Sequence, residues 1–396
     1  MNFSGVWFLG WRYLLRNRWK ALLLIAAFTL VWVLPVALLL VVDRVGENLR
    51  ERALSTPLLA GRAGSPLELM FNGLYFTYPD LATMTLKEVD AIRETGHAEA
   101  IPYYARFSSR GFRIVGTNPD YARFRDLKMA AGRSFLRLGE CVVGSNVARE
   151  LDVEVGGSVI SSPEMLFDLA GVYPLKMTVV GELAPTGTAD DDTILVDLKT
   201  TWIIEGLGHG HQAASDISAE FRIGEGEDSD SGEAAESIRL GAAVPEYNEI
   251  TPENVDSFHF HGDVGDYPVT GAWVIPTSVK ERALLKGDFA QLAELQLIEP
   301  AEELEKLLAT VFRLRGLVVA LLVLVGIAAL ALGGLVLLLS HRLRAEEFRH
   351  LAQLGTGRGM IRALVVFEAG FVIATSLVMS GLILATLNEL SQRWGQ

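Results

Sequence analysis

The sequence predicts an α-helical membrane protein with three transmembrane helices and a large α+β domain inserted between the first and the second helix. Long apolar runs occupy residues 21–42, 316–340 and 363–387, with Glu368 as their only charge. As helices, such runs are long enough to cross the ~30 Å hydrocarbon core of a bilayer. A long, mostly polar segment separates the first run from the second, and the last two runs lie close together.

Basic residues beside the apolar runs predict the orientation, because Lys and Arg near a span stay on the cytoplasmic side. They precede the first run and fill the loop between the last two: Arg12, Arg16, Arg18, Lys20, Arg342, Arg344, Arg349, Arg358 and Arg362. We expect a cytoplasmic N-terminus and an outer segment at 43–312. The first run exceeds the roughly 7–15 apolar residues of a signal peptide and no cleavage pattern follows it, so we expect an uncleaved anchor.

The chain then divides into segments in order. We expect a cytoplasmic interfacial helix at 1–20, a transmembrane helix at 21–42, an outer stalk at 43–60, an outer α+β domain at 61–288, a second stalk at 289–315, transmembrane helices at 316–340 and 363–387 around a cytoplasmic loop at 341–362, and an outer tail at 388–396. The first helix is interfacial because Trp7, Phe8, Trp11 and Tyr13 are typical of the aromatic belt. The second stalk rests on helical periodicity over 289–312.

Alternating apolar runs predict strands in the outer domain, at 112–116, 140–144, 177–183 and 192–198, and short helices are expected at 85–94 and 146–151. Residues 224–237, GEGEDSDSGEAAES, are acidic and rich in Gly and Ser, which favours a mobile loop. The spacing of an EF-hand is missing from it. Cys141 is the only cysteine, so the chain forms no internal disulfide, and its apolar strand predicts an inert thiol.

The motifs of nucleotide hydrolysis and of common hydrolases are missing from the sequence: it has no GxxxxGK[ST], GxSxG or HExxH pattern. We therefore expect no enzyme activity and an energy source in another polypeptide. The net charge of −13 reflects an acidic outer segment on basic membrane flanks, which gives no indication of nucleic-acid binding. Glu368, inside the last run, is expected to snorkel or to pair with Arg362.

The cytoplasmic loop predicts a short helix with an apolar stripe at Phe348, Leu351 and Leu354. Charged side chains surround the stripe: Arg342, Arg344, Glu346, Glu347 and Arg358. Glycines at 355, 357 and 359 end the helix and permit a sharp return. Such a helix suits either a groove on a partner protein or the lipid interface.

The loop RLRAEEFRHLAQLGTGRGMIRALVVFEA (Arg342 to Ala369) resembles the MacB/FtsX/LolC-type permeases of ABC systems, which act by mechanotransmission. The segments FRIVGTNPDYARFRDLKMAAGRSF, ECVVGSNVARELDVEVGGSV and MTVVGEL are similar, in order and spacing, to the periplasmic module of that family. The resemblance implies an inner-membrane protein with a MacB-like periplasmic domain, pairing as a homodimer with ABC ATP-binding subunits that bind ATP and Mg²⁺. The loop would dock into those subunits. Such permeases usually carry a fourth span, whereas we expect three here.

Two His-x-His pairs distinguish this sequence: His209 with His211, and His259 with His261. On an extended segment, residues i and i+2 share a face, so both imidazoles of a pair can reach one ion. Zinc accepts such ligands, and oxygen donors lie nearby at Glu205, Asp263 and Asp266. Surface histidines or a pH-responsive patch are the alternatives. The HFHG pairing also resembles, more weakly, a permease subgroup linked to zinc acquisition in Gram-negative bacteria.

Taken together, these patterns predict the permease subunit of an ABC system that transmits cytoplasmic ATP hydrolysis to a periplasmic domain. The partners expected outside are a periplasmic protein or a metal carrier, with zinc as the candidate metal. Two other functions stay open: a lipoprotein-release or efflux permease, and a non-transporting membrane-anchored metal sensor or regulator of a cell-wall enzyme.

Overall fold

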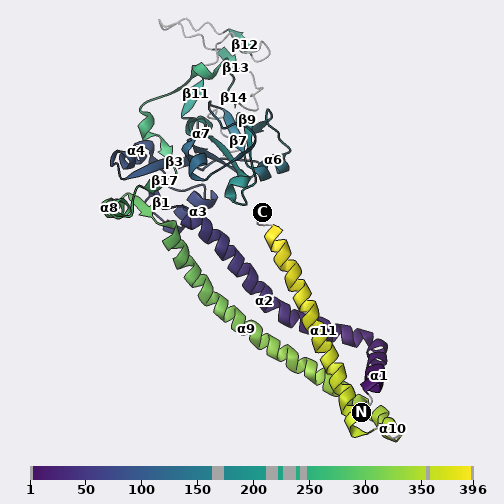
Figure 1. The fold of residues 1–396 in the computed structure, drawn as a ribbon. Coiled ribbons are helices and arrows are strands. Elements are labelled where there is room, and N and C mark those ends of the chain that lie inside the picture. Colours follow the sequence, from purple (N-terminus) through teal and green to yellow (C-terminus); the bar gives the residue numbers. More distant parts are fainter. Residues whose placement is uncertain are drawn as a thin grey trace. The chain divides into compact units, whose positions relative to one another are not determined.

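The structure of the chain, a computed structural model, describes residues 3–162, 174–210, 222–225, 238–240, 248–353 and 357–393. It forms two compact units (Figure 1). The helical unit comprises residues 1–49 and 306–396, and the α+β unit comprises Arg50–Glu305. The segment between the first and second apolar runs thus forms a unit of its own.

The helical unit is built from five helices: α1 (Phe3–Arg16), α2 (Arg18–Leu54), α9 (Pro300–Leu343), α10 (Ala345–Gln353) and α11 (Arg358–Arg393). The last residues of α2 and the first of α9 belong to the α+β unit. Within the described part of the chain, three segments are long and apolar enough to cross a membrane: Arg18–Leu54, Pro300–Ser340 and Gly359–Glu389. The three predicted apolar helices are therefore present, while their insertion in a bilayer stays a prediction.

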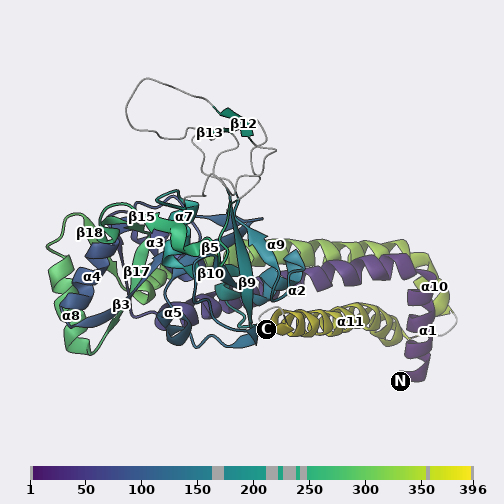
Figure 2. The same ribbon diagram turned by 90° about the horizontal axis from the view of Figure 1, so that it is seen from above.

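Small residues and hydroxyl groups hold the long helices together. Figures 1 and 2 show α2 and α9 side by side, and Phe28 of α2 occupies the space that a Cβ on Gly333 of α9 would need. Between α2 and α11, the Thr29 hydroxyl donates to the Ser376 carbonyl at 3.5 Å, and the Ser380 hydroxyl donates to the Thr29 carbonyl at 3.4 Å. Contacts of this kind are typical of helix packing in membranes.

The N-terminal helix α1 packs on α11 through aromatic edges. The ring centroids of Trp7 and Phe367 are 5.3 Å apart, and those of Trp11 and Phe371 are 5.6 Å apart. Gly10 permits this approach, because a Cβ there would lie 2.4 Å from the Phe367 ring. The predicted interfacial helix is thus also a packing partner of the last apolar helix.

The α+β unit is organised around one mixed sheet of twelve strands. Its main path runs β14 (Asn248–Glu249), β9 (Leu175–Leu183), β7 (Glu140–Val143), β10 (Thr193–Asp197), β5 (Phe112–Thr117), β3 (Ala98–Tyr104), β17 (Gly271–Pro276), β1 (Leu58–Arg62) and β18 (Leu295–Ile298). Three short strands join it from the side: β4 (Ser108–Ser109) on β5, and β6 (Met129–Gly132) and β8 (Ser158–Ile160) on β9.

The remaining elements of this unit are short. Its helices are α3 (Pro66–Tyr75), α4 (Leu86–Glu94), α5 (Asp120–Phe124), α6 (Ser145–Leu151), α7 (Leu198–Ile204), α8 (Val279–Phe289) and the 3₁₀ turns η1 (Ala189–Asp192), η3 (Val255–Ser257) and η4 (Val264–Asp266). Small ribbons pair β2 (Met84–Thr85) with β16 (Pro268–Val269), β11 (Gly208–Gly210) with β15 (Phe258–Phe260), and β12 (Arg222–Glu225) with β13 (Ile238–Leu240).

Local sequence explains the elements that were predicted. In β9 the buried side chains alternate with more exposed ones, as in a strand with one face on the core. Helix α4 begins with a capping box, in which Thr85 and Glu88 each bind the other's backbone N–H group. The predicted strands at 112–116, 140–144, 177–183 and 192–198 and the helices at 85–94 and 146–151 are confirmed as β5, β7, β9, β10, α4 and α6.

The two predicted stalks differ from the structure at their outer ends. Helix α2 stops at Leu54, because the apolar residues Leu58–Arg62 enter the sheet as β1. Residues 290–299 are not helical as predicted: Leu295–Ile298 form β18, which pairs with β1, and α9 begins only at Pro300. Because β1 and β18 are antiparallel neighbours, both long helices join the α+β unit at the same edge of its sheet.

Several predicted features fall where the structure gives no placement. Gly224 and Glu225 of the predicted acidic loop belong to β12, and residues 226–237 lie outside the described residues. The same holds for His211, for Leu354 and for the last residues of the predicted outer tail.

Candidate functional site

A cluster of charged groups joins α10 to the long helices. We call this region, α10 with the adjoining ends of α9 and α11, the elbow. At its centre Glu368 of α11 lies 3.5 Å from the Lys20 ammonium of α2 and 3.3 Å from Arg344, the residue between α9 and α10. The predicted partner of Glu368, Arg362, is therefore wrong. Lys20 and Arg344 reach the carboxylate from two other parts of the unit, which local sequence spacing does not reveal.

Aromatic and hydroxyl groups complete the cluster. The Arg344 guanidinium lies 3.5 Å from the centroid of the Tyr13 ring and 4.8 Å from that of Phe348, both within the range of cation–π attraction. The Ser340 hydroxyl is hydrogen-bonded to Tyr13 at 3.2 Å and accepts a hydrogen bond from Lys20. Side chains of α1, α2, α9, α10 and α11 thus meet around one carboxylate.

The predicted coupling residues differ in their exposure, and some of their side chains are not described. Arg342 and Glu346 are exposed, whereas Phe348 is only 7% exposed and lies under Arg344 instead of on an open apolar stripe. Glu347, Leu351 and Arg358 belong to α10 and α11, but their side chains are outside the described part of the chain. Docking of this helix into an ATP-binding subunit stays a prediction, and Arg342, Glu346 and Arg349 are the exposed charges that it offers.

One member of the first histidine pair, His209, lies opposite the second pair in another part of the structure, the ribbon formed by β11 and β15. The register of this antiparallel pair sets His209 directly opposite His259, with Gly208 opposite Phe260. The sequence did not reveal this approach, because the pairs are far apart along the chain. Directly opposite residues of an antiparallel pair lie on the same face of a ribbon.

Alternation along β15 separates an apolar face from a histidine face. Phe260 packs on Trp202 and Tyr267, with ring centroids 6.2 and 5.9 Å away, and it fills the space that a side chain on Gly208 would need. His259 and His261 flank this anchor, and their ring centroids are 4.7 Å apart. Two imidazoles are therefore presented together beside the core.

Two of the three predicted oxygen donors, Glu205 and Asp263, take part in other contacts. Glu205 accepts a hydrogen bond from the Tyr104 hydroxyl at 2.9 Å and lies 3.6 Å from Arg106. Asp263 caps η4 by accepting from the Gly265 N–H, and Asp266 is exposed. Among the described residues, no group of three or more His, Cys, Asp or Glu side chains is placed to hold a metal ion. Within the proposed zinc set, the side chains that the structure describes are those of His259 and His261.

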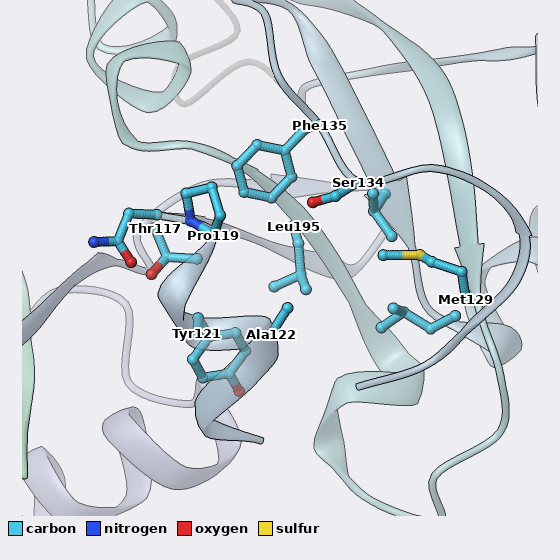
Figure 3. A pocket seen from close by; sticks show the side chains of 11 residues that line it. Thr117, Pro119, Tyr121, Ala122, Met129, Ser134, Phe135 and Leu195 are labelled. Carbon is cyan, nitrogen blue, oxygen red and sulfur yellow. The ribbon is translucent and has the colours of Figure 1, made fainter. Parts of the chain in front are cut away.

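A small apolar pocket with a cavity volume of about 10 Å³ lies beside α5 in the α+β unit, with side chains such as Phe135, Leu195 and Met129 around it (Figure 3). Ligand pockets usually measure about 300–1,000 Å³ and combine apolar walls with a few convergent polar groups. No charged side chain lines this one. We assign no ligand to it.

Two features of the α+β unit bear on function. Cys141 is fully buried in β7, and burial raises the pKa of its thiol, in agreement with the predicted inert state. Arg52, in the last turn of α2, forms a buried ion pair with Asp190 that the sequence did not predict. Nothing in the sequence distinguishes this arginine, which follows Arg50 and Glu51 in a charged stretch at the end of a long helix.

Comparison with known proteins identifies the family. Residues 35–239, about half of the chain, match the family model of the MacB-like periplasmic core domain. The chain belongs to the MacB/FtsX-like family of ABC transporter permeases. Members of this family work with ABC ATP-binding subunits. With its three apolar helices, the match indicates a membrane protein that carries an extracytoplasmic domain. A search among curated proteins found no match.

Solved structures similar to this family member come from related transporters. The periplasmic region of MacB from Actinobacillus actinomycetemcomitans is 8% identical, with 66% of this chain and 98% of that chain covered and a TM-score of 0.36. The extracellular domain of the noncanonic ABC-type transporter YknZ from Gram-positive bacteria is 10% identical, with 61% and 98% covered and a TM-score of 0.32. A domain of a putative permease from Porphyromonas gingivalis is 12% identical, with 61% and 86% covered and a TM-score of 0.26.

Proposed function

We propose that this permease carries the effect of ATP hydrolysis, performed by a separate cytoplasmic subunit, to its own extracytoplasmic domain. The observation that supports this most is Glu368, whose carboxylate binds both Arg344 beside α10 and Lys20 at the start of α2. A push on α10 would reach α2 through these ion pairs. Helix α2 is continuous from Arg18 to Leu54, so the displacement would reach the far end of the helix.

The rest of the proposal concerns orientation and assembly. The elbow and α1 would lie in the cytoplasm, since their flanks are basic, and the α+β unit would lie in the periplasm, on an inner membrane whose lipid surrounds the helices. Two copies would pair around two ATP-binding subunits that hold ATP and Mg²⁺. The domain would then act on a periplasmic partner protein, and no substrate path through the bilayer is needed.

The test of this proposal is association with an ATP-binding subunit. The full chain is purified in detergent from its own membranes and probed for a co-purifying protein with a GxxxxGK[ST] motif and ATPase activity. Charge reversal of the exposed elbow residues, Glu346→Lys with Arg349→Glu, should abolish the association, because it reverses the charges that α10 presents to the partner. The packing of Phe348 is left untouched. The matched control is Arg12→Glu, an exposed arginine on α1. Association that survives the elbow reversal would contradict docking at α10.

A second proposal concerns cargo, and the register of the histidine ribbon supports it. Because His209 is paired with His259, and His259 lies beside His261, the four histidines 209, 211, 259 and 261 are candidates for one zinc site. Neutral imidazole nitrogens are ordinary zinc ligands. Zinc would then be the cargo of the system or the signal of a sensor.

Calorimetric titration of the full chain with ZnCl₂ tests this second proposal. Binding should be lost when the four ribbon histidines are changed to Ala and retained when the other three, His97, His341 and His350, are changed instead. Equal zinc binding by both variants, or no zinc binding by the unchanged chain, would mean that the ribbon histidines are ordinary surface residues. That result would favour a lipoprotein-release or efflux permease.

A further inference from the structure

The last turn of α2 is held in the α+β unit by one buried arginine. The Arg52 guanidinium makes two parallel contacts with Asp190, from Nη1 to Oδ2 at 2.7 Å and from Nη2 to Oδ1 at 3.2 Å. Its Nε donates to the Leu74 carbonyl at 2.5 Å. The side chains of Arg52 and Asp190 are 6% and 1% exposed. A bidentate ion pair of this kind fixes the orientation of the guanidinium as well as its distance from the carboxylate.

Asp190 is itself fixed on two sides. The hydroxyl of Tyr121 donates to Asp190 Oδ1 at 2.5 Å, and that of Thr188 donates to Oδ2 at 2.8 Å. Asp190 lies in η1, which leads directly into β10 in the middle of the sheet. The carboxylate therefore cannot follow a moving arginine without moving β10.

An aromatic stack continues from the ion pair into the sheet. Tyr121 stacks on Trp273 of β17, and Trp273 stacks on Tyr103 of β3, with ring centroids 4.4 Å apart in both cases. The Trp273 indole N–H donates to the Gly73 carbonyl at 2.8 Å. Arg52 is thus connected to the strands on both sides of β5, through η1 to β10 and through the stack to β17 and β3.

Helix α9 is attached to the same unit differently. Its first turns form ion pairs at the surface, Glu302 with Lys286 at 3.3 Å and Glu305 with Arg50 at 2.9 Å. Arg50 and Glu305 are 38% and 62% exposed, so water and salt weaken their attraction. Leu304 is buried, but an apolar contact resists separation and does not fix a rotation. The two long helices therefore differ in how firmly their ends are oriented.

We propose that Arg52 is the positioning residue that locks the end of α2 to the core of the extracytoplasmic domain, so that α2 and not α9 is the helix that moves the domain. The inference deepens the proposed function and rests on it for the source of the movement. The locking itself needs no nucleotide. A variant without Arg52 would keep the contacts of the elbow and its association with the ATP-binding subunit. The end of α2, however, would no longer have a fixed orientation in the domain.

The test measures how firmly the end of α2 is held in the full chain, reconstituted in lipid nanodiscs. Spin labels are placed on exposed positions by Glu51→Cys on α2 and Lys199→Cys on α7. Cys141 is buried and needs no removal. Pulsed double electron–electron resonance then gives the distribution of the distance between the labels. We expect one narrow distribution in the otherwise unchanged chain and a broad one in Arg52→Met.

Two controls separate locking from general damage. Arg50→Met breaks the exposed pair two residues earlier, and Arg113→Met removes an arginine that donates to the Phe76 and Arg106 carbonyls inside the domain. Both should keep the narrow distribution. If Arg52→Met does not fold, adding Asp190→Leu removes the stranded carboxylate, and the double variant should show the broad distribution.

A distribution that stays narrow without Arg52, in the single or the double variant, would overturn the proposal. So would broadening of equal size in Arg50→Met or Arg113→Met. No ATP is added, so the result is independent of whether an ATP-binding subunit associates with the elbow.

Discussion

The charge of Asp190 depends on its neighbours. Burial raises the pKa of this carboxyl, but the Arg52 charge and the hydrogen bonds from Arg52, Tyr121 and Thr188 outweigh burial and hold the pKa below its ordinary value of 3.8. A carboxyl group whose pKa is lower in the folded chain than in the unfolded chain contributes its full stabilisation at pH values above the pKa of the unfolded chain. Its contribution is lost as the pH falls from there through the folded pKa.

We predict that Asp190→Asn lowers the free energy of unfolding of the α+β unit by about 3 kcal/mol at neutral pH, since it leaves the Arg52 charge buried without its counter-charge. Below pH 3.8 the difference in the free energy of unfolding between Asp190→Asn and the unchanged chain should shrink. Urea unfolding of the detergent-solubilised chain, followed by tryptophan fluorescence across pH, measures both. Asp126→Asn, at a site 91% exposed, is the control. A difference that does not change with pH would contradict this account of Asp190.

The buried thiol gives a second prediction at this scale. Cys141 is fully buried in β7, and burial raises the pKa of its thiol, so little thiolate is present and reagents cannot reach it. We expect no labelling by N-ethylmaleimide in the folded chain at neutral pH and complete labelling in urea, both read by mass spectrometry. Rapid labelling without denaturant would mean that β7 opens easily.

At the scale of elements, the sequence predicted those whose signals are local. Alternating apolar residues indicated β5, β7, β9 and β10, and α4 and α6 were expected as short helices. The sequence misled at β18, because LQLI suits a helix or a strand until its partner β1 is known. It could not reveal the contact of Glu368 with Lys20 or that of Arg52 with Asp190, because these partners lie 348 and 138 residues apart in the sequence.

The elbow gives the prediction that belongs to this scale. Glu368→Gln removes the charge that holds Lys20 and Arg344, so α10 should separate more easily from α1 and α11. We expect faster tryptic cleavage after the exposed Arg349 in nanodiscs, with Glu389→Gln as the control. Unchanged cleavage in Glu368→Gln would mean that aromatic packing alone holds the elbow.

At the scale of the whole molecule, three apolar helices and one interposed domain could be predicted from the order of apolar and polar segments. The family followed from the loop at 342–369 and from the motifs of the outer domain, and the match over residues 35–239 confirms it. In the proposed function, movement depends on connections at both ends of α2, which are the Lys20 ammonium beside the elbow and the Arg52 guanidinium in the domain. Neither connection has a sequence motif, since each is made by folding.

In the proposed function, ATP hydrolysis in the cytoplasm moves the extracytoplasmic domain. Hydrogen–deuterium exchange of the full chain with its ATP-binding subunit, with ATP and without nucleotide, tests it most directly at β1 and β18, where the long helices join the sheet. We predict that exchange at Leu58–Arg62 and Leu295–Ile298 changes when ATP is added. Active hydrolysis with unchanged exchange throughout the domain would contradict the claim.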